Sequence, residues 1–162
     1  IYDNEICLEE KNYFMIQRGP YRIAAVLDES VCSDPLVIEG HFVDLFDPSL
    51  IVYRQVRVKP DENALLFDLD YHPREKGVQL IAASSRVEEI VQNEAGFEMV
   101  VKGPEQIRAV ARLFCPNEPI EAHLSIGNKR KSIDWEWHRE SKTVLLNYVH
   151  SAEEVTKVQV IW

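Results

Sequence analysis

The sequence predicts an all-β protein, folded as an antiparallel β-sandwich of two packed sheets with about eleven or twelve strands. Apolar and polar residues alternate along many short segments, which is the period of a half-buried strand. Clusters of Gly, Pro, Asn, Asp and Ser separate these segments at short intervals, as they do in sandwiches. Because no long segment carries a helical period, and because so many strands exceed one open sheet, two sheets must pack together or close.

The segment Gln55–Asp70 shows this alternation most clearly. Val56 and Val58 alternate with charged residues, polar turn formers follow, and an apolar run then resumes. Pro60 has no N–H to give to a central ladder, and Asp61 can enter the left-handed region, so reversal of the chain costs least here. We therefore predict a β-hairpin over this segment.

Strong breaks separate the other strands of the first half. Residues 13–18 and 21–28 alternate on either side of Gly19-Pro20, a pair that interrupts regular structure. Two apolar pieces follow at residues 36–38 and 41–46, and a turn closes the second one. This spacing of short strands favours a sandwich.

The second half continues the strand pattern with two exceptions. Residues 79–87 fit a strand, but residues 87–92 are the best candidate for a helical turn, and residues 127–132 form a polar turn. Residues 106–114 alternate and predict a strand, although the same residues could form an amphipathic helix. Further strands are predicted at 97–101, 120–126, 133–138, 143–149 and 156–162. Residues 139–142 are predicted to be a hairpin loop, and the last strand is predicted to be an edge or penultimate strand.

Length and composition define the broad class. The chain has 162 residues, 46% hydrophobic and 28% charged, which suits a single β-sandwich module over residues 1–162. A net charge of −9 argues against nucleic acid as a partner, and the apolar runs are too short to span a membrane. The basic residues Lys129–Lys131 are interpreted as a solvated loop. Since the chain starts at Ile1 and ends at Trp162 on an apolar strand pattern, we expect a piece excised from a longer protein.

Reactive motifs are scarce in this sequence. Cys7, Cys32 and Cys115 are widely spaced and odd in number, which predicts three free thiols and leaves their redox state open. The five histidines show neither HxH nor HExxH spacing, and Ser84 and Ser85 stand in no GxSxG context. No catalytic residue is therefore assigned.

Carboxylates are plentiful, so several pairs could serve a glycoside hydrolase, which needs two such groups across a cleft. Asp68 and Asp70 stand two apart on a strand and share a face, which suits a calcium site at a sheet end; a solvated edge is the competing interpretation. Beyond calcium at this point, no cofactor is expected. The remaining pairs are Asp28 and Glu29, Asp44 and Asp47, and Asp134 and Glu136.

Trp135 and Trp137 are the candidate carbohydrate-binding residues. Alternate residues of a strand point the same way, so the two indoles could form a flat platform for sugar rings. Asp134, Glu136 and His138 would flank the indoles, and the acidic side chains among them could bind hydroxyls. The alternative is that both indoles fill the core between the sheets, which their size also suits.

Several stretches of the chain resemble one known kind of module. They are NYFMIQRGPYRIAAVLDES, GHFVDLFDPSL, VRVKPDENALLFDLD, GPEQIRAVARLFCP and the closing part from Trp135 through SKTVLLNYVHSAEEVTKVQVIW. Together they cover most of the chain and resemble a β-sandwich module found toward the C-terminal end of large secreted bacterial glycoside hydrolases and related uncharacterised proteins. The chain departs from that pattern at Pro60-Asp61-Glu62, where Pro-Gly-Glu is expected.

The resemblance implies that catalysis belongs to a separate domain, while this sandwich packs against it, links it to other modules or contacts glycan. It also implies a secreted, periplasmic or cell-surface location, with neighbouring domains of the same polypeptide as partners. We therefore expect a non-catalytic accessory module of a carbohydrate-active enzyme. A carbohydrate-binding module that uses the tryptophan platform is the first alternative, and a stand-alone hydrolase with an Asp/Glu pair is the second.

Overall fold

The computed structural model describes residues 10–28, 32–71, 77–93, 96–151 and 155–162. In these ranges the chain forms fourteen strands in three antiparallel sheets and no helix. The predicted all-β sandwich class is confirmed, and the number of strands is slightly larger than expected. No helix in the described ranges is long and apolar enough to cross a membrane.

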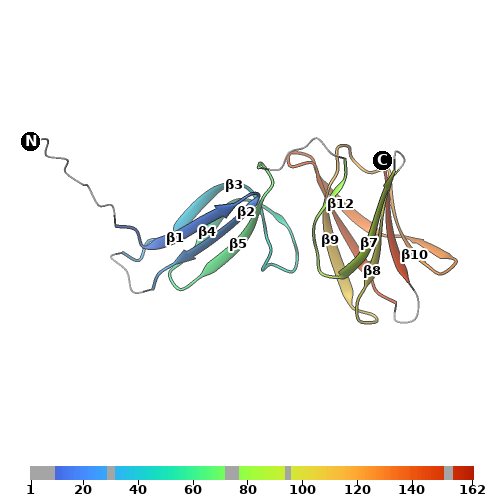
Figure 1. Cartoon of the computed structure of the whole chain (residues 1–162), viewed down its shortest axis with the longest axis horizontal. Coiled ribbons are helices and arrows are strands. Elements are labelled where there is room, and N and C mark those ends of the chain that lie inside the picture. Colours follow the sequence, from blue (N-terminus) through green and yellow to red (C-terminus); the bar gives the residue numbers. More distant parts are fainter. Residues whose placement is uncertain (1–9, 29–31, 72–76, 94–95, 152–154) are drawn as a thin grey trace, which may run out of the picture.

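The first five strands form one sheet, the N-terminal sheet, which lies to the left in Figure 1. Gly19 and Pro20 separate the first two strands as predicted, and these strands pair along their whole length. The strand order is β1-β2-β5-β3-β4. The five strands are β1 (Tyr13–Arg18), β2 (Tyr21–Val26), β3 (Leu36–Asp44), β4 (Val52–Val58) and β5 (Asn63–Asp68).

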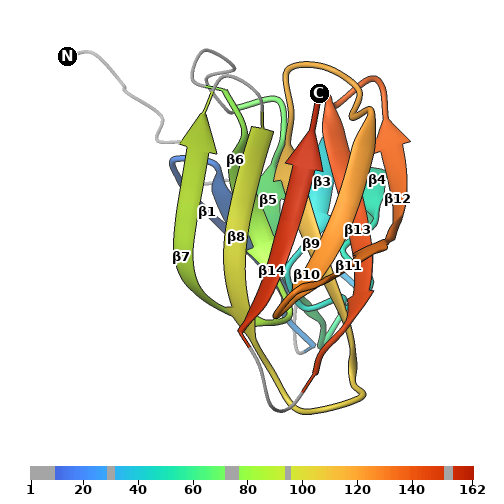
Figure 2. The same ribbon diagram turned by 90° about the vertical axis from the view of Figure 1, so that its right-hand side faces the viewer.

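The remaining strands form a sandwich of two sheets (Figures 1 and 2). The sheet that adjoins the N-terminal sheet, called here the inner sheet, has the order β12-β13-β9-β6. The outer sheet has the order β11-β10-β14-β8-β7. The strands are β6 (Gln79–Ala83), β7 (Arg86–Asn93), β8 (Gly96–Lys102), β9 (Arg108–Phe114), β10 (Glu121–Ile126), β11 (Lys129–Ser132), β12 (Asp134–His138), β13 (Thr143–Val149) and β14 (Thr156–Ile161).

Three apolar clusters show how the sheets stack. The largest lies between the inner and outer sheets and contains fully buried Leu146. A second cluster, around fully buried Leu66, lies within the curl of the N-terminal sheet, where β3 and β4 pass behind β1, β2 and β5 (Figure 1). The third cluster joins the N-terminal sheet to the inner sheet, which is therefore covered on both faces. Its members are Val43, Leu50, Phe67, Leu69, Ile81, Phe114 and Leu145.

One buried arginine links these two layers. Arg112 of β9 is only 3% exposed, and its Nε donates to the Leu50 carbonyl oxygen at 2.5 Å. Its Nη1 donates to Thr143 Oγ1 at 2.9 Å. Burial lowers the pKa of Arg112 to about 10, so the guanidinium still carries its charge at neutral pH. Leu50 has a φ of 50°, a left-handed conformation that a leucine adopts only when its surroundings hold it there.

The predicted hairpin over Gln55–Asp70 is wrong, although the strands and the reversal between them are present. β3 lies between β4 and β5, so the two strands do not pair with each other. The Glu62 N–H donates to the Lys59 carbonyl at 3.0 Å, and Asp61 has a φ of 65°, a left-handed conformation that favours glycine. Val26 of β2 then bonds Asp61 and Glu62 at 3.1 Å each. Alternation identifies strands but leaves their partners undetermined.

Residues 79–92 form two strands rather than one strand and a helical turn. β6 ends at Ala83, and the chain crosses from the inner to the outer sheet at Ser84-Ser85. The helical turn predicted over 87–92 is wrong because these residues pair with β8. A register shift between Val87 and Glu89 breaks the strict alternation, and the resulting spacing imitates a helical one.

Two further strand predictions are corrected, and two are confirmed. Part of the predicted turn at 127–132 forms the exposed edge strand β11, and β14 is the middle strand of the outer sheet rather than an edge or penultimate strand. The strand predicted over 106–114 is present as β9. The loop at 139–142 joins the paired strands β12 and β13 as predicted.

Candidate functional site

The residues of the predicted tryptophan platform lie on two faces of β12. Trp135 and Trp137 are half-buried and pack against the cluster between the two sandwich sheets. Glu136 and His138 alternate with them along the strand and so face the other way, toward the N-terminal sheet. His138 Nδ1 lies 2.8 Å from Ser141 Oγ. The two indoles share a face, but the structure does not bring all four side chains together, and sugar binding by them stays a prediction.

The proposed calcium ligands are engaged with protein groups. Arg22 Nη2 donates to Asp68 Oδ2 at 2.5 Å, and the backbone N–H groups of Asp70 and Tyr71 donate to Asp68 Oδ1 at 3.0 and 3.2 Å. Asp70 accepts from the backbone N–H of His41 at 3.1 Å, and its other oxygen lies 3.1 Å from His41 Nδ1. The two carboxylates thus fix the turn after β5 and its contact with β3.

The carboxyl pair Asp44 and Asp47 stabilises a turn. Asp44 Oδ1 accepts from the Phe46 N–H at 2.9 Å. Asp47 accepts from the Ser49 hydroxyl at 2.7 Å and from the Tyr53 hydroxyl at 2.7 Å. The hydrogen bond from the Ser49 hydroxyl is the largest cause that lowers the pKa of Asp47, and the bond from Tyr53 adds to it. The general acid of a glycosidase needs a raised pKa instead.

The other predicted groups give no reactive site. Cys115 is fully buried, and burial raises the pKa of its thiol to about 12, so the nucleophilic thiolate is absent at neutral pH. Cys32 is an exposed free thiol. Cys7 and Glu29 lie outside the described residues.

Sequence reasoning missed a buried polar cluster where β7 begins and β13 ends. Ser85 Oγ lies 2.8 Å from His150 Nε2 and 2.7 Å from the Tyr148 hydroxyl. Ser85 and His150 are 65 positions apart, so no local motif could reveal the pair. Gly103 closes the cluster, because a Cβ at this position would approach the imidazole to 2.4 Å.

This Ser–His pair is arranged for structure rather than for nucleophilic attack. His150 Nδ1 is buried with no hydrogen-bond partner among the described residues, and burial lowers the pKa of the ring. If Nε2 donates to Ser85, only a lone pair at Nδ1 goes unsatisfied. A catalytic base would instead accept the serine proton at Nε2 and leave an N–H buried at Nδ1 without an acceptor, which costs more.

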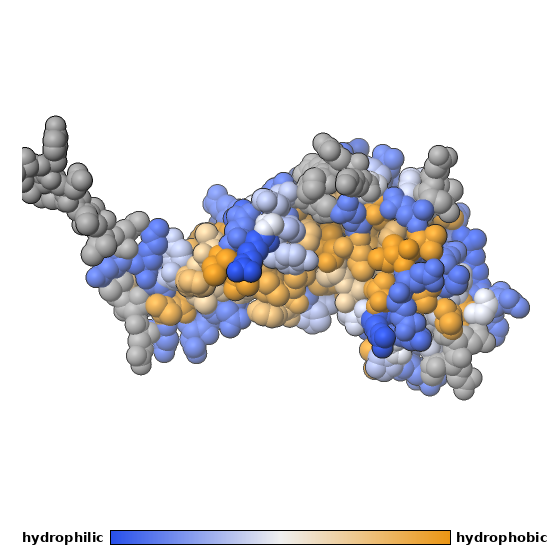
Figure 3. Space-filling model, in the orientation of Figure 1, coloured by the Kyte–Doolittle hydropathy of each residue, from blue (hydrophilic) through white to orange (hydrophobic). Residues whose placement is uncertain are grey.

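Part of the N-terminal sheet presents apolar side chains to solvent. We call this surface, formed by Phe14, Ile16, Tyr21, Ile23 and half-buried Leu65, the apolar face. Ile16 pairs with Ile23, which pairs with Leu65, so the three lie side by side across β1, β2 and β5. Phe14 is 55% exposed and Ile23 48% exposed. Figure 3 shows apolar side chains gathered over this sheet.

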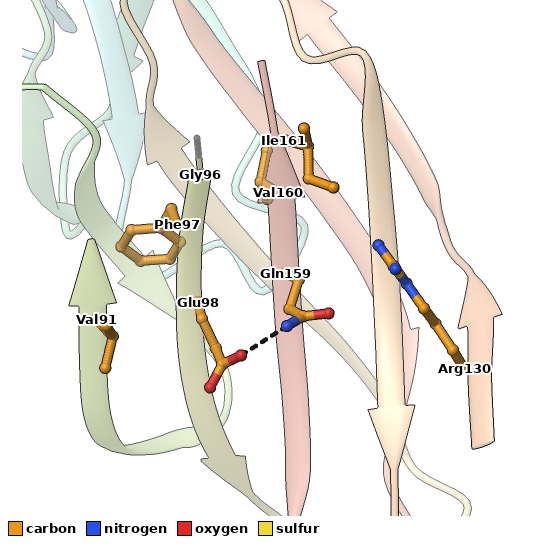
Figure 4. Close-up of a pocket in the computed structure, with 8 residues that line it drawn as sticks. All are labelled: Val91, Gly96, Phe97, Glu98, Arg130, Gln159, Val160 and Ile161. Atoms are coloured by element: carbon orange, nitrogen blue, oxygen red, sulfur yellow. Dashed lines mark hydrogen bonds between the residues drawn. The ribbon is translucent and has the colours of Figure 1, made fainter. Parts of the chain in front are cut away.

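The outer face of the outer sheet carries a shallow hollow of about 330 Å³, which we call the outer hollow (Figure 4). Glu98 and Gln159 lie across neighbouring strands and are joined by a hydrogen bond of 2.6 Å. Arg130 reaches toward them from β11 (Figure 4). The lining residues are Val91, Gly96, Phe97, Glu98, Arg130, Gln159, Val160 and Ile161.

No family model, curated protein or solved structure matches this chain. Its described residues also hold no group of three or more His, Cys, Asp or Glu side chains that could bind a metal ion. Among the described residues, the apolar face and the outer hollow are two surfaces of distinct character, one on the N-terminal sheet and the other on the outer sheet.

Proposed function

We propose that the chain is a non-catalytic accessory module of a carbohydrate-active enzyme, and that its apolar face packs against another domain of the same polypeptide. The observation that carries this proposal is the exposed row Ile16, Ile23 and Leu65. Exposed apolar patches on soluble proteins commonly mark interaction sites. The sequence resemblance described above supports a secreted or cell-surface parent enzyme.

The apolar face continues an interface that is already formed. Tyr21 pairs with Phe67, their rings meet edge to face at 5.4 Å between centroids, and Phe67 belongs to the cluster packed on the inner sheet. One side of the N-terminal sheet is thus covered by the sandwich at one end and uncovered at the other. A neighbouring domain with a complementary apolar surface would complete that coverage.

The chemistry of the carboxylates supports a non-catalytic role. In the part of the chain that the structure describes, hydrogen bonds are the main reason that the pKa values of Asp47, Glu98 and Glu121 are lowered. A glycosidase acid is held protonated by a raised pKa. The hydrolase alternative has no support in these groups.

Hydrogen exchange tests the docking proposal. We expect the amides of residues 13–26 to exchange at least about tenfold more slowly in the full-length polypeptide than in the 162-residue chain, because a docked domain covers them. Mass spectrometry of both proteins gives the comparison. Equal exchange rates in the two proteins would contradict docking.

A matched pair of variants makes the test specific. Ile23 and Val149 are similarly exposed, at 48% and 45%, but Val149 lies on β13, outside the apolar face. Ile23→Ser should remove the extra protection in the full-length polypeptide, and Val149→Ser should leave it unchanged. In parallel, the 162-residue chain should not hydrolyse aryl glycosides; turnover would restore the hydrolase alternative.

A further inference from the structure

The outer hollow has polar groups that are fixed before any ligand arrives. Glu98 Oε1 accepts from Lys157 Nζ at 2.8 Å, and Glu98 Oε2 accepts from Gln159 Nε2 at 2.6 Å. The hydrogen bond from Lys157 is the main reason that the pKa of Glu98 is lowered, so the carboxylate stays charged and keeps lone pairs for further donors. Ser125 Oγ lies 3.4 Å from Gln159 Oε1 and holds the amide from the other side.

Arg130 adds hydrogen-bond donors beside Glu98 and Gln159. It lies on the exposed strand β11, pairs through its backbone with Ser125, and makes no ion pair or side-chain hydrogen bond with any described residue. In Figure 4 its side chain crosses β10, and its guanidinium points toward the part of β14 that carries Ile161. The hollow therefore combines a charged acceptor, an amide and a guanidinium whose charge also acts on Glu121 of β10.

Apolar side chains lie on either side of Glu98 and Gln159. Val91, 45% exposed, and Ile161 flank this pair on β7 and β14. Gly96 pairs with Ile161 and must be glycine, because a Cβ there would lie 2.7 Å from the Val160 carbonyl oxygen of the neighbouring strand. A ligand can lay an apolar surface against Val91 and Ile161.

The charges and the backbone pairing narrow the class of ligand. Glu98 forms an ion pair with Lys157, and the charge of Arg130 acts on Glu121 of β10, so these four groups carry no net charge that would select an ion. Glu98 and Gln159 disfavour a purely apolar molecule. An extended peptide adds to a free strand edge, and the free edges of this sheet are β7 and β11, whereas Glu98 and Gln159 lie on β8 and β14, which are paired on both sides. A neutral ligand with several hydroxyl groups, which both donate and accept, and with an apolar C–H face meets all these conditions.

We propose that the outer hollow binds a neutral saccharide unit. Glu98 accepts from its hydroxyls, Arg130 and Gln159 bond its oxygens, and Val91 and Ile161 contact its C–H face. The volume of about 330 Å³ is at the lower end of small-ligand sites, which suits one or two sugar rings. This site is separate from the apolar face and from the tryptophans of β12, so it goes beyond the docking function.

Titration of the ¹⁵N-labelled 162-residue chain with cellotetraose, xylotetraose, mannotetraose and maltotetraose tests the proposal by NMR. We expect saturable shifts of the backbone amides of Gly96, Glu98 and Gln159 with at least one of these sugars, with a Kd on the order of 1 mM or tighter. No saturable shift with any of them would overturn it. Shifts confined to the indole N–H groups of Trp135 and Trp137 would also overturn it and would favour the platform on β12.

Variants locate the binding groups. Arg130→Gln should weaken binding by roughly tenfold or more, because it removes a charge-assisted donor. Arg86→Gln makes the same change of charge on β7, outside the hollow, and should leave the Kd unchanged. Gln159→Leu should weaken binding as well, with an unchanged spectrum elsewhere as evidence of folding. Equal affinity in all three variants would overturn the site, and Ile23→Ser, which tests docking, should not affect the Kd.

Discussion

The sandwich and the N-terminal sheet bury their apolar residues in different ways. In the sandwich, two sheets face each other across one large cluster, and the residues that point outward from β14 are mainly polar. The N-terminal sheet has no facing sheet on its concave side and buries that side by curling. Its other side is covered by the inner sheet at one end and carries the apolar face at the other.

This difference shows which part of the chain depends more on the other. The sandwich buries its largest apolar cluster between its own two sheets and needs the N-terminal sheet only to cover the other face of the inner sheet, whereas the curled N-terminal sheet has one side half covered and apolar area left to bury. The N-terminal sheet is thus held by the sandwich and remains available for another contact. If the two regions differ in this way, substitutions in each of them should affect stability separately.

Truncation of one core residue in each region should separate their unfolding. Leu66 and Leu146 are both fully buried, one inside the N-terminal sheet and the other in the sandwich. Replacement of either by alanine should cost about 3 kcal/mol, from the lost apolar contacts and the cavity left behind. Leu66→Ala should unfold the N-terminal sheet first, whereas Leu146→Ala should unfold both regions, because the N-terminal sheet loses its support.

The tryptophans allow this to be measured. Trp135, Trp137 and Trp162 all pack against the sandwich cluster, so their fluorescence reports the sandwich alone, while circular dichroism reports every strand. In urea, the dichroism transition of Leu66→Ala should precede its fluorescence transition. Coincident transitions in both variants would mean that the two regions unfold as a single unit.

Replacement of residues with a left-handed backbone conformation by glycine should stabilise each region separately. The gain should be smaller than the loss from truncation of a core leucine. Asp61 in the N-terminal sheet and Lys142 in the sandwich have φ values of 65° and 52°. Glycine has no Cβ to clash in this conformation, so Asp61→Gly and Lys142→Gly should each gain about 0.5 to 1 kcal/mol. Asp61→Gly should shift only the dichroism component of the N-terminal sheet, and Lys142→Gly the fluorescence transition. A loss of stability would show that the side chains contribute more than the strain costs.

Mild acid should have the smallest effect, and it should appear in the sandwich. Burial lowers the pKa of His150 from the ordinary value of 6.5, so the folded protein binds this proton less readily than the unfolded chain. Protonation of His150 therefore does not reduce the free energy of unfolding above pH 6.5, and this free energy falls as the pH drops below 6.5. His150→Gln should flatten this dependence in urea transitions followed by fluorescence between about pH 5 and pH 7.5. If the pH dependence of the unfolding free energy is the same in His150→Gln and in the wild-type protein, His150 is not its source.

The elements of the fold were largely predictable, but their partners were not. Alternation and the Gly19-Pro20 break give β1 and β2 with nearly the right ends, because both signals are local. The insertion of β3 between β4 and β5 depends on distant residues such as Val26, and no spacing within the segment records it. The division into three sheets is likewise a matter of long-range packing.

The candidate site was less predictable for the same reason. The i, i+2 rule places Trp135 and Trp137 on one face of β12 and Glu136 on the other, but only the packing of the sheets shows which face lies toward the sandwich core. The outer hollow assembles residues from β7, β8, β11 and β14, which are far apart in the sequence. A cluster such as Ser85 and His150 leaves no local pattern at all.

The hydrogen bond from Arg112 to the Leu50 carbonyl limits the relative motion of the N-terminal sheet and the inner sheet. Because a guanidinium from one layer holds a strained loop of the next, inside an apolar cluster, the two layers have little freedom to swivel. The chain would then serve as a stiff spacer. A domain packed on the apolar face and a sugar bound in the outer hollow would stay at a set separation and orientation, and loss of the Arg112 contacts would let the two regions move against each other.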